Sequence, residues 1–360
     1  MSPGKESWHP QALATRMACL KKRGKIMVAL RDFFARADFT EVETPCLQIS
    51  PGLEPHLHAF ATVLTDPWGG ADQTLYLHTS PEFAMKKLLV AGMERIFQIA
   101  HVFRNGERSA THSPEFSMLE WYRAGGTIEQ MMDDTQALVS ACAQAAGASM
   151  LRRGALSCDP FAPWQRLSIA QAFSHYCDMD ILATAPDPWA PDIALLAAQA
   201  RRIGISVSPT DGWDDIFFKI LLDRIEPHLG MAVPTILHSY PVSMAALARP
   251  NPADPRVADR FEAYACGVEL CNAFGELTDA IEQERRFRAD MDLKQALYGQ
   301  RYPLDRDFLA ALAHGMPESA GNALGLDRLI MLICNAASID DVLWLPVRAN
   351  DQINDPCAIP

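Results

Sequence analysis

The sequence lacks long apolar stretches and paired cysteine motifs. No apolar run reaches the roughly 18 residues that a membrane-spanning helix needs, and residues 1–7 lack the apolar core of a signal peptide. The nine cysteines are scattered, form no C-x-x-C pair and do not cluster with the ten histidines. We therefore expect a cytoplasmic protein with reduced, mostly buried thiols and without structural zinc.

Positive charge is also scarce. The chain of 360 residues carries a net charge of −12, which argues against broad electrostatic binding to a nucleic-acid backbone. The one dense basic run, Lys21-Lys22-Arg23-Gly24-Lys25, lies on a helical pattern. It is typical of a solvated helix face, with a local nucleic-acid contact as the alternative.

The periodic segments that are present indicate an α+β domain. Helices are expected at about 12–37, 127–146 and 279–297. Strands are expected at 75–79, 95–104, 115–123, 234–240, 260–267 and 268–277. Between them, about 150–232, repeated prolines punctuate short helical patches, which we interpret as a helical insertion and not as part of the sheet. This order predicts a mainly antiparallel sheet flanked by helices, in one domain spanning 1–360.

Residues 321–330 join a strand end of small residues directly to a helix that opens on Asp327-Arg328. A backbone without side chains can lie against a flat ring, and an arginine just inside a helix start can hold phosphate oxygens. Turns of this kind also serve close packing alone. By itself, the segment is only a hint of an ATP site.

A second segment runs over residues 95–107 and returns through 112–116. Arg104 ends an apolar strand next to Asn105, Gly106 and Glu107. An arginine there can grip a phosphate while the following turn meets a polar ring edge. The alternative interpretation is a hairpin with a charged, solvated tip.

A third segment, residues 267–279, contains Glu269 and Glu276. Seven positions apart on a strand, they point to opposite faces unless a bulge intervenes, and Gly275 is a plausible bulge site. With such a bulge the two carboxylates would converge and hold Mg²⁺ between phosphates.

The three segments together resemble the catalytic core of class II aminoacyl-tRNA synthetases. Residues 39–45 resemble the first motif of that class, which forms its dimer interface, and residues 104–116 and 321–329 resemble the second and third. The nearest member of the class is lysyl-tRNA synthetase. The residues of that kind are Thr79-Ser80-Pro81-Glu82, His112-Ser113-Pro114-Glu115-Phe116, Pro234-Thr235, Tyr240-Pro241, Glu269, Asn272, Phe274 and Glu276-Leu277.

One part of a lysyl-tRNA synthetase is missing. The helix of the first motif begins at about residue 12, so we expect no anticodon-binding domain. This shortened form resembles the elongation factor P β-lysine ligase family, as do Leu119-Glu120-Trp121-Tyr122 and Ala323, which stands where the synthetase has glycine. That family activates (R)-β-lysine with ATP and passes it to the ε-amino group of a lysine on elongation factor P. The resemblance implies that Ala323 reshapes the amino-acid pocket for a β-amino acid.

The resemblance also implies a role for each site residue. Arg104 and Arg328 would be catalytic, Arg104 on the α-phosphate and Arg328 on the adenine or the γ-phosphate. Phe116 would stack on the adenine. The implied ATP-binding residues are Arg104, Asn105, Gly106, Glu107, His112, Ser113, Phe116, Glu269, Leu270, Gly325 and Arg328. The implied amino-acid-binding residues are Ser80, Pro81, Glu82, Tyr122, Asn272, Glu276 and Ala323. Glu269 and Glu276 are the implied Mg²⁺ ligands.

Two positions depart from the family pattern. The glutamate that usually stands two residues after the second-motif arginine is Gly106 here, and Glu107 follows it. Ser113 stands where asparagine is more usual. Either Glu107 swings into the adenine-reading role or a backbone group takes that role over.

The resemblance predicts a two-step ligase that uses ATP and Mg²⁺. It implies elongation factor P as the acceptor, no role for tRNA or a membrane, and a homodimer. One alternative is an enzyme that activates α-lysine or another amino acid for a different acceptor. Another is an inactive, regulatory synthetase paralogue, which the retained Arg104, Glu269, Glu276 and Arg328 speak against.

Overall fold

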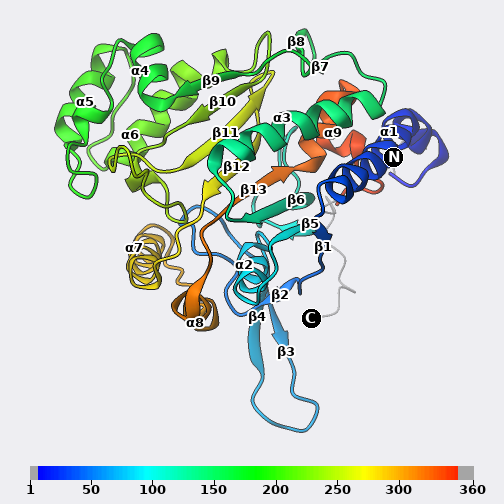
Figure 1. The fold of residues 1–360 in the computed structure, drawn as a ribbon, viewed down its shortest axis with the longest axis horizontal. Helices are drawn as coiled ribbons and strands as arrows, with labels where there is room; N and C mark the ends of the chain where they lie inside the picture. The colour runs from blue at the N-terminus through cyan, green and yellow to red at the C-terminus, as the bar shows by residue number, and fades with distance from the viewer. Residues whose placement is uncertain (1–6, 348–360) are drawn as a thin grey trace, which may run out of the picture.

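The computed structural model describes residues 7–347, which form an α+β fold around an eight-stranded sheet (Figure 1). Residues 1–6 and 348–360, among them Cys357, lie outside the described residues. The sheet order is β1 (Thr40–Glu41), β5 (Arg95–Phe103), β6 (Glu115–Ala124), β13 (Ser319–Gly325), β12 (Val268–Gly275), β11 (Arg260–Ala265), β10 (Thr235–His238) and β9 (Gln165–Ser168). Only the two outer pairs, β1–β5 and β9–β10, are parallel. The expected mainly antiparallel sheet is confirmed.

Three helices cover one face of this sheet: α1 (Pro10–Arg36), α3 (Ile128–Ala145) and α9 (Leu326–Cys334). Pro10 suits the first position of α1 because its missing N–H would have no partner there. At α3, Thr127 and Gln130 form a capping box. The core beneath the helices contains Phe34, which is stacked on Phe97 of β5 and packs beside Trp121 of β6.

One residue of the basic run in α1 is buried and not solvated. Arg23 forms an ion pair with Asp327 in the first turn of α9 and donates to the Ser117 hydroxyl at 2.8 Å. Asp327 also accepts the Ser117 backbone N–H at 2.7 Å. The solvated face that the sequence predicts holds for the exposed Lys21 and Lys25, whereas Arg23 ties α1 to α9 and β6.

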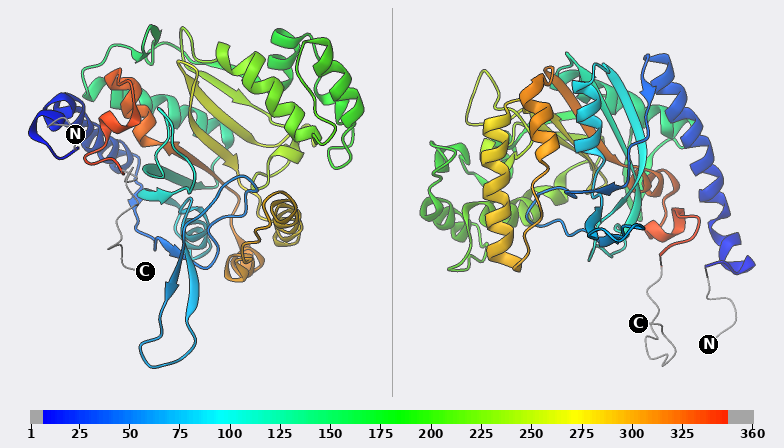
Figure 2. Two further views of the ribbon diagram at one scale, coloured as in Figure 1. Left: turned by 180° about the vertical axis from the view of Figure 1, so that it is seen from behind. Right: turned by 90° about the horizontal axis from the view of Figure 1, so that it is seen from below.

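A second group of helices packs on the other side of the molecule. It consists of α2 (Glu82–Val90), α7 (Ala280–Tyr298) and α8 (Arg306–Gly315). Phe83 of α2 stacks on Phe308 of α8, which joins these helices in a core of their own. Seen from below in Figure 2, α1 lies on one side of the molecule and α7 and α8 on the other. Neither α2 nor α8 was among the helices expected from sequence.

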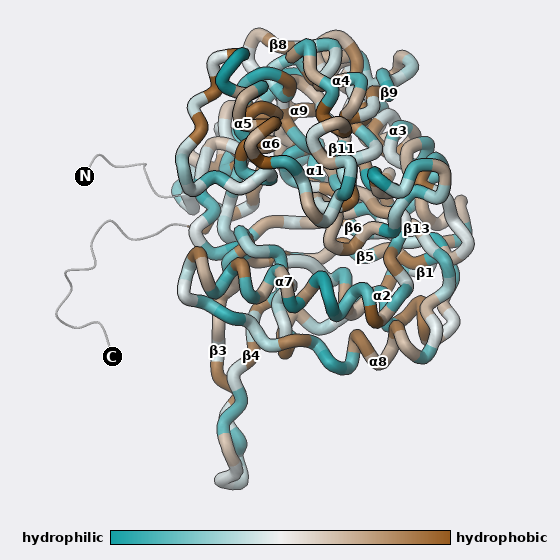
Figure 3. The backbone as a smooth tube through the Cα atoms, turned by 90° about the vertical axis from the view of Figure 1, so that its left-hand side faces the viewer, coloured by the Kyte–Doolittle hydropathy of each residue, from teal (hydrophilic) through white to brown (hydrophobic). Residues whose placement is uncertain are grey.

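A small sheet of β2 (Leu47–Gln48), β4 (Gln73–Leu77) and β3 (Ala61–Leu64) lies beneath the main sheet. Its β3–β4 hairpin projects away from the body of the protein (Figures 1 and 3). Val63 of β3 and Trp68 in the connecting loop are exposed.

The segment 150–232 is only partly the helical insertion that the sequence predicts. Its helices are α4 (Ile169–Cys177), α5 (Ile193–Arg202) and α6 (Trp213–Ile220), and they share a core with Leu237 of β10. However, β7 (Leu151–Arg153) pairs with β8 (Leu156–Cys158), and β9 is the outer strand of the main sheet. The expectation that this region stays outside the sheet was therefore wrong for residues 165–168. Shorter 3₁₀ and π turns lie at Leu182–Thr184, Leu221–Ile225, Glu226–His228, Val242–Met244 and Ile339–Val342.

Within residues 7–347, none of the helices combines the length and the apolar character that crossing a membrane requires.

Candidate functional site

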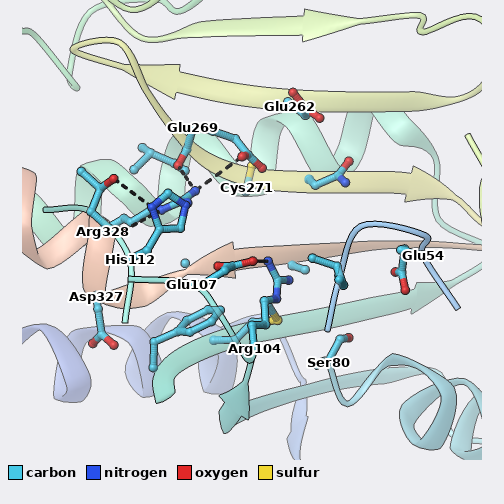
Figure 4. Close-up of a pocket in the computed structure, with 18 of the residues that line it drawn as sticks. Glu54, Ser80, Arg104, Glu107, His112, Glu262, Glu269, Cys271, Asp327 and Arg328 are labelled. Atoms are coloured by element: carbon cyan, nitrogen blue, oxygen red, sulfur yellow. Dashed lines mark hydrogen bonds and ion pairs between the residues drawn. The ribbon is translucent and has the colours of Figure 1, made fainter. Parts of the chain in front are cut away.

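A cavity of about 400 Å³ lies on the sheet face opposite α1, α3 and α9. Its walls come from β6, β12 and β13, from the loop 104–116 and from the start of α2. Figure 4 shows Arg328, His112 and Glu269 at one end, Ser80 and Glu54 at the other, and Arg104 between them. We call these the Arg328 end and the Ser80 end.

The alternation of the strands decides which side chains reach this cavity. On β6, Phe116 and Met118 line it, whereas Leu119 and Trp121 point into the core on the other face. On β13, Ala323 lines the cavity and is directly opposite Asn272 of β12 and Glu120 of β6. Residues paired across antiparallel strands share a face, so Glu120 points to the same side as Ala323.

A bulge lies in β12, but not where the sequence predicts it. Ala263 pairs with Cys271 and Tyr264 pairs with Glu269, which leaves Leu270 without a partner. The bulge shifts the alternation by one position, so that Glu269 lies on the cavity side together with Asn272 and Phe274. Gly275 is paired regularly with Ala320; the expectation of a bulge at Gly275 was wrong.

The Arg328 end is organised around one guanidinium. Arg328 Nη2 lies 2.5 Å from Nε2 of His112, and Nη1 donates to the Glu269 carbonyl at 3.0 Å. Burial, and then the charge of Arg328, lower the pKa of His112. A neutral imidazole can accept a hydrogen bond from the arginine at Nε2, so His112 orients the guanidinium without repelling it.

Arg104 occupies the middle of the cavity. Its guanidinium carbon lies 5.3 Å from the centre of the Phe116 ring, and Nη1 lies 3.8 Å from a carboxylate oxygen of Glu107. Gly106 has a φ of +85°, a conformation that strongly favours glycine. The turn at Gly106 therefore directs Glu107 into the cavity beside Arg104 (Figure 4).

Two further carboxylates line the cavity, Glu269 at the Arg328 end and Glu262 nearer the middle (Figure 4). Burial, and then the charge of Glu262, raise the pKa of Glu269. Glu262 accepts hydrogen bonds from Arg260 at 2.7 Å and from the hydroxyls of Tyr240 at 2.6 Å and Tyr264 at 2.5 Å.

Glu276 lies far from this pair. It contacts residues of the Ser80 end, and seven residues along a strand span about 20 Å. A single Mg²⁺ needs its oxygen ligands within about 2.1 Å. These positions do not support the expected convergence of Glu269 and Glu276 on one ion, which stays a prediction.

At the Ser80 end, three side chains form a hydrogen-bonded chain. Ser80 donates to Glu120 at 2.5 Å, and the Tyr122 hydroxyl donates to the other oxygen of Glu120 at 3.0 Å. Glu120 is fully buried. Burial, and then the charge of Glu82, raise the pKa of Glu120 to about 8. The free protein thus holds a carboxyl group that titrates near neutral pH.

Lys86 of α2 joins two of the expected amino-acid-binding residues. It forms ion pairs with Glu82 and with Glu276, the latter at 2.5 Å, and Lys86 and Glu276 are almost completely buried. Burial opposes the charge of Lys86, but Glu276 and Glu82 outweigh it and raise its pKa. Burial raises the pKa of Glu276 to about 7 although Lys86 lowers it.

The sequence suggests that the bare backbone around Gly321 lies against the ring of a nucleotide, but the ring beside Gly321 is that of Tyr122. A Cβ at this position would overlap the Tyr122 ring and lie 2.7 Å from Oε1 of Glu276. The bare backbone therefore accommodates Tyr122, a side chain of the protein itself. At Gly325 a Cβ would meet nothing closer than Cδ of Arg328 at 3.5 Å, so this glycine leaves the cavity open.

Most of the residues expected from sequence meet in this cavity. Those that line it are Ser80, Glu82, Arg104, Glu107, His112, Ser113, Phe116, Glu269, Leu270, Asn272, Ala323, Gly325 and Arg328. Tyr122 and Glu276 lie behind the wall at the Ser80 end, in contact with Glu120 and Lys86. Pro81 is the N-cap of α2, and the Asn105 N–H donates to the His58 carbonyl at 2.7 Å. Like Gly106, these two residues do not line the cavity.

Four residues of the site were not among those expected: Glu54, Lys86, Glu120 and Glu262. Glu120 and Glu262 sit among apolar residues of strands, where an unpaired carboxylate is costly, and this signal could have identified them. Lys86 looks like any lysine on an amphipathic helix. Glu54 follows Gly52 and Leu53 in an extended segment whose sequence offers no signal.

Comparisons with known proteins point in one direction. The family model for class II tRNA synthetases (D, K and N) matches residues 13–349. An elongation factor P–(R)-beta-lysine ligase of Pectobacterium carotovorum subsp. carotovorum is 38% identical over 344 residues, which cover 95% of this chain and 98% of that protein. Proteins of the same name from Yersinia enterocolitica and Salmonella schwarzengrund are 38% identical over 343 residues, with the same shares covered.

Proposed function

The chain belongs to the class II tRNA synthetases, in the branch that contains the elongation factor P–(R)-beta-lysine ligases, and we propose that it carries out the reaction for which those relatives are named. A carboxylate oxygen of (R)-β-lysine attacks the α-phosphorus of ATP, and pyrophosphate leaves. The neutral ε-amino nitrogen of a lysine on elongation factor P then attacks the acyl carbon. The bond to AMP breaks, AMP leaves with the electron pair, and the nitrogen gives up a proton.

The observation that carries this proposal is the opposite character of the two ends of one cavity. Arg104 and Arg328 supply guanidinium groups toward one end, where a polyphosphate needs them. Glu82 supplies a carboxylate at the other, where a diamine needs it, and Glu120 lies directly behind the lining Ser80, which donates to it. A nucleotide and a diamino acid can therefore lie end to end, with the reacting carboxylate and the α-phosphate between them near Arg104.

We assign the roles of the chain's own residues on this basis. Arg104 holds the α-phosphate and stabilises the charge that develops on it. Phe116 offers a ring face to the adenine, and Glu107 lies where it can accept from the adenine amino group. Arg328, oriented by His112, binds at the far end of the nucleotide. Catalysis rests on positioning and electrostatics, and no side chain acts as a nucleophile.

The charge balance of the Ser80 end fits the proposed amino acid. Glu54, Glu82, Glu120 and Glu276 provide four carboxyl groups, and Lys86 pairs with two of them, Glu82 and Glu276. The excess of carboxyl groups suits the two ammonium groups of β-lysine. Ala323 lies on the wall between Asn272 and Glu120, where its methyl group shapes the space for the substrate backbone.

Mg²⁺ is part of the proposal, with Glu269 as the residue that would hold it. The charge of Glu262 raises the pKa of Glu269, and a cation beside Glu269 relieves that repulsion, whereas Glu262 itself already pairs with Arg260 at 2.7 Å. Mg²⁺ commonly uses one or two protein carboxylates together with phosphate oxygens. When bound, it would neutralise phosphate charge.

We further propose a single catalytic domain without a tRNA-binding part, in a cytoplasmic homodimer. The family match over residues 13–349 supports one domain, and the net charge of −12 speaks against tRNA. All eight cysteines of residues 7–347 are free, as is usual in the cytoplasm. Exposed Val63 and Trp68 on the hairpin offer apolar surface for a second copy. Light scattering tests the dimer, with twice 39.7 kDa expected.

Mass spectrometry of elongation factor P tests the proposed reaction. The factor is incubated with the protein, ATP, Mg²⁺ and (R)-β-lysine, and we expect its mass to increase by one β-lysyl group on a lysine. ATP–pyrophosphate exchange run in parallel should be stimulated more by (R)-β-lysine than by α-lysine. An unchanged mass, or a preference for α-lysine, would contradict the proposal.

A further inference from the structure

A second cavity, of about 550 Å³, adjoins the first. It lies between the helical segment 188–218, the turn 243–247 and α7. Figure 3 looks onto this side of the molecule, with α5 and α6 above and α7 below. Both cavities are lined by Glu54, Phe218, Arg260, Asn272 and Phe274, so that they meet at these residues. Glu54 marks the junction as lying at the Ser80 end (Figure 4).

We propose that this second cavity is the passage through which the acceptor lysine side chain reaches the amino-acid adenylate. The inference rests on the proposed function, because it needs an adenylate in the first cavity and a protein-bound amine as the acceptor. It adds the route of that amine and the residues that guide it, of which Trp189, Asp290 and Leu293 lie outside the first cavity.

The walls of the passage suit the methylene chain of a lysine. Trp213 is buried in the wall, whereas Trp189, Phe218 and Leu293 are partly exposed around the cavity. Lysine side chains cover apolar surface with their stems while the ammonium group seeks polar partners, and aromatic faces attract ammonium groups. The apolar part of this wall therefore suits the stem of a lysine that must reach an acyl carbon in the first cavity.

Two carboxylates on the passage wall make no ion pair within residues 7–347. Asp290 of α7 makes neither a hydrogen bond nor an ion pair with its side chain within residues 7–347, and Oε2 of Glu54 is buried without a partner there. Burial, and then the charge of Glu54, raise the pKa of Asp290 to about 7. Two acidic groups that raise each other's proton affinity form a site that gains stability when a cation enters.

The basic groups near these walls offset only part of the acidic charge. Arg260 on the wall donates to Glu262 at 2.7 Å, and Arg286 behind it donates to Glu282 at 2.8 Å and to the Ala248 carbonyl at 2.9 Å. Lys294 donates to backbone carbonyls, among them that of Pro55 at 2.8 Å, so it keeps its charge and offsets one carboxylate, that of Glu54. Asp290 and Asp214 line the passage and make no ion pair within residues 7–347, so its net charge is negative, which matches an incoming ammonium group.

The test separates adenylate formation from transfer. Asp290→Asn removes the charge at a similar side-chain size, and Leu293→Arg places a positive charge at the rim of the passage. We expect each to lower kcat/KM for elongation factor P by about tenfold, measured as β-lysyl transfer by mass spectrometry. ATP–pyrophosphate exchange with (R)-β-lysine should stay within about twofold of the wild-type rate, since neither side chain lines the first cavity.

Matched controls come from the same helix. Asp292→Asn and Leu297→Arg make the same changes on α7 at exposed positions that do not line the passage, and both should transfer at the wild-type rate. Transfer at the wild-type rate by Asp290→Asn and Leu293→Arg would overturn the inference alone. A raised KM for β-lysine in exchange would also overturn it, because the carboxylates would then bind the amino acid. A wild-type protein that forms no adenylate with β-lysine would overturn the proposed function.

Discussion

Nζ of Lys86 lies 2.5 Å from Oε2 of Glu276, and the two groups meet in the interior between α2 and the end of β12. The protein thus carries its own ammonium group beside the carboxylates expected to bind a diamine. This arrangement explains how Glu276 can be buried in the free protein. It also means that a magnesium ion at Glu276 would compete with Lys86 for the carboxylate.

Replacing Lys86 by methionine should destabilise the protein. The change leaves Glu82 and Glu276 without their shared cation, and breaking a buried pair costs about 3–5 kcal/mol. Denaturant unfolding followed by circular dichroism measures the loss. The double variant Lys86→Met/Glu276→Gln should recover part of it, whereas Lys25→Met on the exposed face of α1 should change nothing. Equal stability of Lys86→Met and the wild type would show that the pair does not stabilise the fold.

Arg104→Ala should reduce ATP–pyrophosphate exchange by about 10²–10³-fold, which is the usual cost of losing one donor that stabilises developing charge. The measurement is the exchange rate at saturating ATP and (R)-β-lysine, with circular dichroism to verify folding. Arg288→Ala removes an exposed arginine that pairs with Glu284 on α7, and its exchange rate should equal that of the wild type. An active Arg104→Ala variant would remove this residue from the mechanism.

Ala323→Gly should shift the preference of the cavity toward α-lysine. The methyl group lies between Asn272 and Glu120, and one methyl in a pocket changes discrimination by about 10–200-fold. The readout is the ratio of kcat/KM values for (R)-β-lysine and α-lysine in the exchange reaction. Ala320→Gly, on the same strand but facing the core, should lower stability and leave the ratio unchanged. A constant ratio in Ala323→Gly would mean that other residues select the substrate.

Binding of β-lysine should release protons near neutral pH. The raised pKa of Glu120, about 8, means that this group is mostly protonated in the free protein at pH 7. An ammonium group bound beside it favours the carboxylate and lowers that pKa, so affinity should increase from about pH 6 to about pH 8 and then level off.

Calorimetric titrations in two buffers of different ionisation enthalpy measure the protons released. Glu284→Gln, a change on the exposed side of α7, should release as many protons as the wild type. Proton uptake, or an affinity that does not depend on pH, would contradict the assignment of Glu120.

The sequence predicted the sheet well because its strands alternate locally. The pairing of β5 with β6 follows from two neighbouring apolar segments, and structure and prediction agree within one or two residues. The strand β9 was missed because its four residues look like part of the helical insertion that follows. Only the pairing with β10, far along the chain, makes them a strand.

Site residues that belong to sequence motifs could be predicted, whereas those whose role depends on tertiary contacts could not. Arg104, His112 and Arg328 stand out by their neighbours in sequence, and the fold brings them to one cavity. The partners of Lys86 and Arg23 are set by tertiary packing, so Arg23 was expected on a solvated helix face and Lys86 was not singled out. The bulge at Leu270 depends on the register with β11, which one strand cannot reveal.

Because Leu270 is unpaired, the alternation of side chains between the two faces of the sheet shifts by one position at this point of β12. Removing this single residue would turn Glu269 away from the nucleotide half of the cavity and leave Asn272 and Phe274 in place in the other half. The two substrates are thus read by parts of one strand that can change independently. A one-residue deletion, normally the most disruptive change a sheet can suffer, would here uncouple recognition of ATP from recognition of the amino acid.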